Sequence, residues 1–378
     1  MSYMRALLVA AATFLALLAV VPIVLLCLPF WVVGFLTRLF CTLLERKTIT
    51  WEEIIEFDSL IGWRPKSNLN IDCSFAAGVF RAETDSLGWA GKSSIADSDI
   101  VVFGDSYAFG YGVNAESMFS ELNPKVRIKS IGAPGYNMAQ EFILMRQLSP
   151  HLRNKLVVWF IFFGNDLYDN LLPNLYQYRI PFVRTRNGSN SWEIVTSHVS
   201  RQRWPFNPEH NYRRKDKLEG TFGDTYLSRR IYSACEFLIG KGKDLCAQSG
   251  ASLIIMTIPW TIQLNLREWE EAFSNGLGNK TFDPQLPDKK IAEICYRLNV
   301  PLVAGKEHLD LSHYILGEGH WNESGHRRVG KILSQLHSDR TVKGPQAAGL
   351  GTRTLEPIPS QEAGAVVQAS SWPGMSTK

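Results

Sequence analysis

Several sequence patterns that identify large enzyme classes are missing from this chain of 378 residues. It contains no Gly-x-x-x-x-Gly-Lys-[Ser/Thr] loop, no His-Glu-x-x-His pair and no Cys-x-x-Cys pair, so nucleotide and zinc chemistry have no recognisable site. Strong charge is missing too, since the formal net charge is +4 and 20% of residues are charged. Nucleic-acid-binding domains carry a more basic surface than this. We therefore expect no nucleic-acid partner, no metal and no cofactor.

Cysteine is scarce, with six residues in the chain. Two of them, Cys27 and Cys41, lie in or beside an apolar N-terminal stretch. The other four are scattered and lack the spacing of a metal site: Cys73, Cys235, Cys246 and Cys295. Both two disulfides and four buried thiols fit this pattern, and buried thiols are the commoner outcome for scattered cysteines.

Charged residues are also missing from a long stretch near the N-terminus. None occurs between Ala6 and Leu36, which is longer than the ~20 residues that span a bilayer. A secretory signal has a shorter apolar region and a small-residue cleavage site, neither of which is found here. We expect an uncleaved membrane anchor. Pro22 divides the stretch, so a single tilted span and a re-entrant hairpin both remain open.

The remaining sequence contains three apolar runs that each end at a polar turn. Val101–Phe103 precedes Gly104-Asp105-Ser106, and the alternating run 126–131 precedes a turn that contains Gly135. The third run, 156–163, is apolar throughout and precedes Gly164-Asn165-Asp166. The carboxyl ends of parallel strands meet at one edge of a sheet, where ligands bind. Ser106, Gly135 and Asn165 are therefore expected to lie together, although each turn could instead be an ordinary helix cap.

The order of the other predicted elements indicates an α/β fold. Helical patterns cover 138–148, 226–249, 287–298 and 328–337, and further strands are predicted at 251–260 and 300–303. Strands that alternate with helices form a parallel sheet covered on both faces. We predict a three-layer α/β/α domain with a central, mostly parallel sheet. His320 lies in a glycine-rich turn just before the last helix.

These turns together resemble the four sequence blocks of the SGNH (GDSL-type) hydrolase family, over about residues 99–337. The resemblance implies that Ser106 is the nucleophile and His320 the general base. It also implies an oxyanion hole formed by the N–H groups of Ser106 and Gly135 and the side-chain amide of Asn165. Such donors stabilise the negative oxygen of the tetrahedral intermediate. His326 is the nearest rival to His320 and is expected to pack or bond locally.

The sequence departs from the family pattern at three places. Ser130 stands where the second block has asparagine, and Phe163 where the third block has its leading glycine. The acid that orients the histidine is normally an aspartate two or three residues before it, but Glu318 stands there. We assign Glu318 as the third member of the triad, with Asp310 as the fallback.

The resemblance implies a serine-dependent acyl-ester hydrolase, and its membrane-anchored bacterial members suggest deacetylation of an envelope glycan. An O-acyltransferase with the same residues is the close alternative, and a non-catalytic glycan-binding or assembly protein is a further one. Arg5 before the apolar stretch and Arg38, Arg46 and Lys47 after it weakly favour a cytoplasmic catalytic domain. The family precedent favours the periplasmic side of the bacterial inner membrane, which we adopt as our expectation.

We divide the chain into four parts: an anchor and juxtamembrane segment at 1–48, an extension at 49–98, a catalytic domain at 99–340 and a disordered tail at 341–378. The catalytic domain carries a long, irregular insertion at about 167–230. This insertion has an excess of Lys and Arg, which fits either a cationic lid or a solvated loop. In the extension, Trp63 and Trp89 could stack on a sugar at the rim of the site or serve as buried plugs.

Overall fold

The computed structural model describes residues 14, 51–75, 78–176, 178–186, 191–200, 214–274 and 281–343. The chain divides into two compact units, Met1–Ile49 and Thr50–Lys378. Apart from Phe14, the predicted membrane anchor lies outside the described residues, as does the predicted tail beyond 343. Among the residues that are described, no helix has the length and apolar character needed to cross a membrane.

A five-stranded parallel sheet forms the centre of the second unit, which confirms the predicted α/β class. Its strand order is β13-β12-β7-β5-β6. The strands are β5 (Ile100–Gly104), β6 (Ile128–Gly132), β7 (Leu156–Phe162), β12 (Ser252–Ile258) and β13 (Leu302–Val303). All five strands were expected from the sequence, with ends that differ by a few residues. Because β5, β6 and β7 are parallel neighbours, their carboxyl ends lie at one edge.

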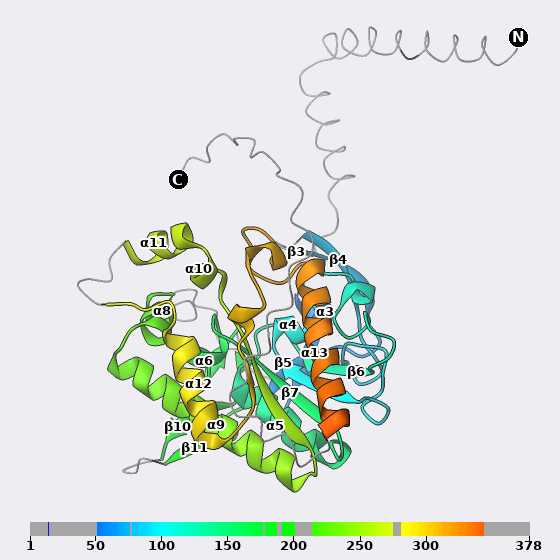
Figure 1. Cartoon of the computed structure of the whole chain (residues 1–378), viewed down its shortest axis with the longest axis horizontal. Helices are drawn as coiled ribbons and strands as arrows, with labels where there is room; N and C mark the ends of the chain where they lie inside the picture. Colours follow the sequence, from blue (N-terminus) through cyan, green and yellow to red (C-terminus); the bar gives the residue numbers. More distant parts are fainter. Residues whose placement is uncertain are drawn as a thin grey trace, which may run out of the picture. The chain divides into compact units, whose positions relative to one another are not determined.

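Helices cover both faces of this sheet (Figure 1). Side chains of α13 (Glu323–Lys343) share one apolar cluster with alternate residues of β5 and β7, such as Val102 and Phe160. The opposite face carries Trp159, whose Nε1 donates to Glu141 of α5 (Met138–Leu148) at 2.6 Å. The Trp159 ring also lies against Gly242 of α9 (Tyr226–Gln248). Helix α12 (Leu286–Leu298) contacts α9 on this side. Full coverage explains why β7 is apolar along its length.

The extension forms a short helix, α3 (Trp51–Ile54), and two β-hairpins. The first hairpin pairs β1 (Ile55–Asp58) with β2 (Gly62–Pro65), and the second pairs β3 (Asn70–Phe75) with β4 (Gly78–Glu83). Each hairpin has a buried aromatic residue, Trp63 in the first and Phe80 in the second, while Val79 is exposed. None of these strands was predicted from the sequence.

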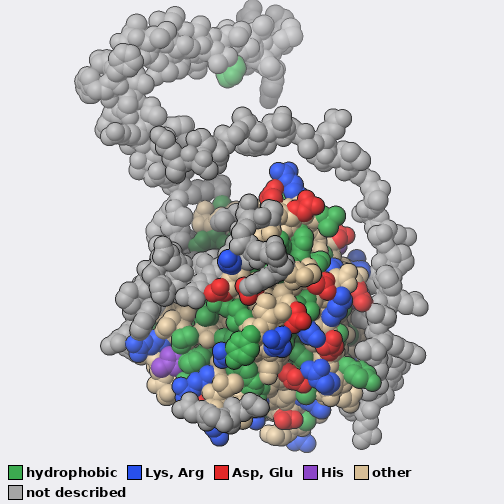
Figure 2. Space-filling view, turned by 90° about the vertical axis from the view of Figure 1, so that its left-hand side faces the viewer, with side chains coloured by type: hydrophobic (Ala, Val, Ile, Leu, Met, Phe, Trp, Pro, Cys, Tyr) green, Lys and Arg blue, Asp and Glu red, His purple; other side chains and the backbone are tan. Residues whose placement is uncertain are grey.

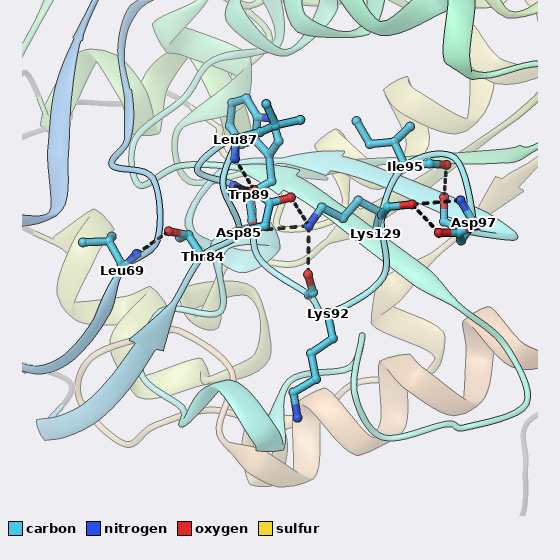
Figure 3. A network of polar contacts seen from close by, with 12 residues as sticks. Leu69, Thr84, Asp85, Leu87, Trp89, Lys92, Ile95, Asp97 and Lys129 are labelled. Atoms are coloured by element: carbon cyan, nitrogen blue, oxygen red, sulfur yellow. Dashed lines mark hydrogen bonds and ion pairs between the residues drawn. The ribbon is translucent and has the colours of Figure 1, made fainter.

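A buried ion pair fastens the end of this extension to the sheet edge (Figure 3). The Lys129 ammonium on β6 lies 2.7 Å from Asp85 Oδ2 and donates to the carbonyls of Gly91 at 2.8 Å and Trp89 at 3.3 Å. Asp85 in turn accepts from the backbone N–H of Trp89. Ala90 then forms an antiparallel bridge with Ser130. The extension therefore continues the edge of the central sheet.

The insertion after β7 is more ordered than predicted. It contains α6 (Asp166–Asp169), β8 (Asn174–Leu175), β9 (Tyr178–Arg179), β10 (Phe182–Thr185), β11 (Trp192–Val195) and α8 (Arg214–Phe222). Strands β8–β9 and β10–β11 form two antiparallel hairpins. Residues 187–190, between β10 and β11, lie outside the described residues, but the two strands do pair. The expectation of an irregular segment was therefore wrong for the described part.

The remaining described helices of the second unit are short. They are α4 (Ser106–Phe109), η1 (Ala115–Ser117), η2 (Ser149–His151), α10 (Thr261–Leu264), α11 (Leu266–Ser274), η3 (Gly305–Glu307) and η4 (Leu311–His313). The four cysteines of the described part are free and buried. Burial raises the thiol pKa of Cys73 to about 11, so these thiols stay protonated at neutral pH.

Candidate active site

Ser106 lies at the end of β5, where the strand turns into α4. The turn is fixed by Asp105, whose Oδ1 accepts from the backbone N–H of Tyr107 at 3.0 Å. Ser106 is 6% exposed, so few solvent molecules can surround its hydroxyl. The geometry is that of a short helix cap, as the sequence suggested for Asp105. It also aims the Ser106 hydroxyl at the loop that carries His320.

Ser106, His320 and Glu318 form a continuous chain of hydrogen bonds. Ser106 Oγ lies 2.7 Å from His320 Nε2. On the other side of the ring, His320 Nδ1 lies 2.9 Å from Glu318 Oε1 and 2.8 Å from Oε2. A carboxylate can only accept a hydrogen bond, so the ring proton belongs on Nδ1. Nε2 is then free to accept the serine proton.

The loop that carries Glu318 and His320 is tightly constrained. An antiparallel bridge between Tyr314 and Trp321 closes it, and Ile315 N–H donates to the carbonyl of His320 at 2.7 Å. From the serine side, the Tyr107 hydroxyl donates to the Gly319 carbonyl at 2.7 Å. Trp321 is fully buried. These contacts hold the base at a fixed distance from the nucleophile.

The environment of Glu318 keeps it ionised. Burial raises the pKa of this carboxyl, but hydrogen bonds from the His320 ring and backbone N–H, with the charge of the ring, bring the net pKa below its usual value. Asp310, the fallback, is placed differently. Its side chain is 73% exposed, and its Oδ1 contacts Ser312 and His313 Nδ1. The structure thus brings Glu318, and not Asp310, to His320.

Gly135 and Asn165 lie at the ends of the neighbouring strands. Gly135 has a φ of +76°, and a Cβ at this position would overlap the ring of Tyr176, so glycine is required there. Asn165 Nδ2 donates to Asp105 Oδ2 at 3.0 Å and lies 3.4 Å from the Tyr136 carbonyl. Asn165 stands at the N-cap of α6 without a side-chain capping bond. Its amide is therefore directed to the serine turn and not to its own helix.

Buried carboxyl groups lie beneath this edge, and sequence reasoning missed one of them. Burial raises the pKa of Asp105, of Glu141 and of Asp166, all three of which are almost fully enclosed. Asp166 Oδ2 accepts from the Phe162 N–H at 2.7 Å and so shapes the turn after β7. Glu141 lies on α5 at a position that looked like an ordinary amphipathic surface residue. Only its pairing with Trp159 explains its burial.

The rival histidine, His326, is a packing residue, as expected. It is 1% exposed and its ring stacks on Phe119 at a centroid distance of 5.7 Å. Its Nδ1 accepts from the Phe119 N–H at 3.4 Å. Burial, with a smaller effect from His320, lowers the pKa of His326 to about 3. It is therefore neutral at the pH of cells.

Burial decides between the two interpretations of the tryptophans in the extension, and ion pairs bear on the charge of the insertion. Trp63 is 1% and Trp89 4% exposed, so the interpretation as sugar-stacking rim residues was wrong and both are buried plugs. In the insertion, Lys217 pairs with Asp169, while Arg184 and Arg186 pair with Glu193. Figure 2 shows Lys and Arg side chains interspersed with Asp and Glu on one face of the molecule. Several of the described cations in the insertion are therefore paired with carboxylates, while its residues 201–213 lie outside the described residues.

A cavity of about 640 Å³ adjoins the loop of the candidate base. It lies between α8, α10–α11 and the segment 311–319, and Glu318 and Gly319 form part of its wall. This volume is in the range of small-molecule sites. In the described parts of the chain, no group of three or more His, Cys, Asp or Glu side chains is arranged to hold a metal ion.

Comparison with known proteins gives a likeness at the level of solved structures. No protein-family profile and no curated protein matches the chain. It is similar to a GDSL-like lipase from Bacteroides thetaiotaomicron VPI-5482, at 11% identity and a TM-score of 0.36, over 66% of this chain and 92% of that chain. It is also similar to a carbohydrate acetylesterase from Sinorhizobium meliloti, at 11% and 0.37, over 64% and 98%. An inhibitor-bound aryl esterase of M. smegmatis matches at 11% and 0.37, over 63% and 98%. These identities and TM-scores are too low to bear on activity or substrate.

Proposed function

We propose that the protein is a serine-dependent acyl-ester hydrolase of the SGNH type. The observation that carries this proposal is the unbroken chain from Ser106 Oγ through His320 to Glu318, with contacts of 2.7 and 2.8 Å. A serine hydroxyl needs such a base because it is a weak nucleophile on its own. Ser106 and the loop that carries Glu318 and His320 come from distant parts of the chain and meet at the carboxyl edge of a parallel sheet, where ligands commonly bind.

In the first half of the reaction, Ser106 Oγ attacks the ester carbonyl carbon and its proton passes to His320 Nε2. Glu318 holds the ring orientation and stabilises the imidazolium, without itself being protonated. The negative oxygen of the intermediate is stabilised by the N–H groups of Ser106 and Gly135 and by the Asn165 amide. For this, Asn165 must give the oxygen its second amide hydrogen, which makes only a 3.4 Å contact with the Tyr136 carbonyl.

In the second half, the alcohol leaves with the proton from His320, and Ser106 carries the acyl group. A water molecule then attacks this acyl ester while His320 takes its proton, and the free acid and Ser106 are restored. An acceptor hydroxyl in place of water would turn the same steps into acyl transfer. We propose a small acyl group, because the Tyr176 ring fills the space beside Gly135. An acetyl ester of an envelope carbohydrate meets this description.

The test uses the full-length chain in mild detergent, with p-nitrophenyl acetate and a fluorophosphonate probe. We expect turnover and probe labelling in the parent, and a loss of about 10⁶-fold in kcat in Ser106→Ala. The variant should unfold at nearly the same temperature as the parent, because only one hydroxyl is removed. A folded parent that neither turns over the ester nor takes the probe would overturn the proposal.

A further inference from the structure

The first hairpin of the extension contacts both chain neighbours of Gly135. Trp63 Nε1 donates to the Pro134 carbonyl at 3.2 Å, and the Tyr136 hydroxyl donates to the Trp63 carbonyl at 2.7 Å. The Trp63 ring also packs against Tyr136 at a centroid distance of 5.9 Å. A single buried residue from the extension therefore ties down both neighbours of the glycine.

A third bond joins the same hairpin to the helix that follows this turn. Gln140 Nε2 donates to the Ile61 carbonyl at 2.7 Å. Gln140 also completes the capping box of α5 with Asn137. The start of α5 and the turn before it thus share one set of contacts with residues 61–63. The turn itself contains a glycine at positive φ, a conformation that needs support from its surroundings to stay fixed.

The second hairpin reaches the base through one intermediate ring. Phe75 and Phe80 pack against Tyr111, with centroid distances of 5.7 and 5.2 Å. The Tyr111 ring in turn lies against the His320 ring at 4.5 Å. Phe80 is 2% exposed and Tyr111 is 7% exposed, so these two rings are almost closed to water, while Phe75 is half-buried. One side of the His320 ring therefore packs against the Tyr111 ring.

We propose that residues 51–83 form a positioning element of the active site, with Trp63 acting on the oxyanion-hole glycine and Phe80 acting on His320 through Tyr111. This inference rests on the proposed function. Oxyanion donors and a general base must be held within about 0.5 Å of their working geometry. The first hairpin holds the oxyanion-hole turn, and the second holds the general base. The extension is then part of the catalytic apparatus and more than a link to the N-terminal unit.

The kinetic test compares three variants of the full-length chain. Trp63→Phe keeps an aromatic ring, although a smaller one, but removes the donor to Pro134, and we expect kcat to fall about 10- to 100-fold with KM within about twofold, as for other small misplacements. Phe80→Leu should lower kcat in the same way. Trp89→Phe is the matched control, because Trp89 is equally buried in the extension but its hydrogen bonds go to Asp85 and Lys129. Its kcat should stay within about twofold.

A second readout does not need turnover. Hydrogen exchange of the peptide that spans 131–138 should be about tenfold faster in Trp63→Phe than in the parent, and unchanged in Trp89→Phe. If the parent lacked esterase activity, the proposed function would fail while this comparison still decided the positioning claim. Equal exchange in Trp63→Phe and Trp89→Phe, or an unchanged kcat in an active Trp63→Phe, would overturn it. If Trp63 had only a structural role, Trp63→Phe and Trp89→Phe would lower the unfolding temperature equally. The two variants would then not differ in the exchange rate of the 131–138 peptide or in kcat.

Discussion

Two small clusters of linked ionisable residues invite comparison: Glu318 with His320 at the candidate site, and Asp85 with Lys129 at the sheet edge. The closest N···O distances are nearly equal, at 2.8 and 2.7 Å. Their surroundings differ. The Lys129 side chain is fully buried and donates to Asp85 and to two backbone carbonyls. The His320 side chain is 21% exposed, and its second nitrogen contacts a hydroxyl.

The difference lies in what each cluster leaves free to change. All three ammonium hydrogens of Lys129 have acceptors, Asp85 and two backbone carbonyls, so the pair holds the extension in place and no reactive group lies beside it among the described residues. In the other cluster, the proton of Ser106 can pass to His320 because Glu318 stabilises the ring once it is charged. Substitutions in the first cluster should therefore cost stability, and those in the second should cost rate.

The variant Glu318→Gln gives the largest expected effect in this comparison and tests whether a substitution at the candidate site lowers the rate but not the stability. The amide keeps the shape but cannot stabilise an imidazolium, so we expect kcat to fall about 10³- to 10⁴-fold. The unfolding temperature should change little, because glutamine matches glutamate in size and its amide oxygen can still accept from an N–H group of His320. Steady-state kinetics and thermal unfolding of the full-length chain measure both. Asp310→Asn is the control and should keep kcat within about twofold, so a large loss there with a small loss in Glu318→Gln would reverse the assignment.

The choice between Glu318 and Asp310 shows where sequence reasoning reaches its limit. Both carboxylates precede His320 within one loop, and spacing alone does not say which reaches the ring. The answer depends on the bridge between Tyr314 and Trp321, which folds the segment so that Glu318 turns back on His320. Such a turn is set by contacts to the rest of the domain, including the Tyr107 hydroxyl.

Much of the fold was predictable because its signals are local. A buried central strand has to be apolar, and the amphipathic run at 138–148 gave helix bounds that the structure confirms. The position of Ser106, Gly135 and Asn165 at one edge follows from parallel strands alone. The strands of the insertion were missed because runs of two to four residues carry too little periodicity to detect.

The role of Trp63 was not predictable for a different reason. Its contact with Pro134 joins residues 71 positions apart, and no local sequence pattern predicts such a contact. A tryptophan in a turn-rich segment fits an exposed platform as well as a buried plug. Only the packing of the hairpin against the turn of Gly135 distinguishes the two.

In the cluster of Asp85 and Lys129, a substitution should lower the stability of the fold. The variant Asp85→Ala tests this. Removal of the carboxylate leaves the Lys129 ammonium buried with carbonyl partners only, which we expect to cost about 3 kcal/mol in the free energy of unfolding. Burial already lowers the pKa of Lys129, against the opposing effect of Asp85. Lys129→Met should cost less, because it removes the buried charge and leaves Asp85 27% exposed. Urea denaturation followed by tryptophan fluorescence gives both values, and the reverse order would contradict this account of the ion pair.

The smallest expected effect concerns His326, which is a histidine like His320 but is fully buried. It tests how burial changes the protonation of a histidine in this fold. Its folded-state pKa of about 3 lies below the ordinary value of 6.5, so the unfolded chain binds a proton more readily than the folded one. Its contribution to stability is complete above pH 6.5 and is lost as the pH falls toward 3. Between pH 7 and pH 5 this amounts to about 2 kcal/mol.

His326→Asn removes the titration while the amide oxygen can still accept from the Phe119 N–H. The variant should be less stable than the parent at pH 7, because the stacking on Phe119 is lost. It should nevertheless lose about 2 kcal/mol less between pH 7 and pH 5, measured by urea denaturation at both values. Buried carboxyls such as Glu141 titrate in both proteins and cancel in this difference. Equal losses would mean that His326 gains a proton in the folded state, so that its burial would no longer separate it from His320.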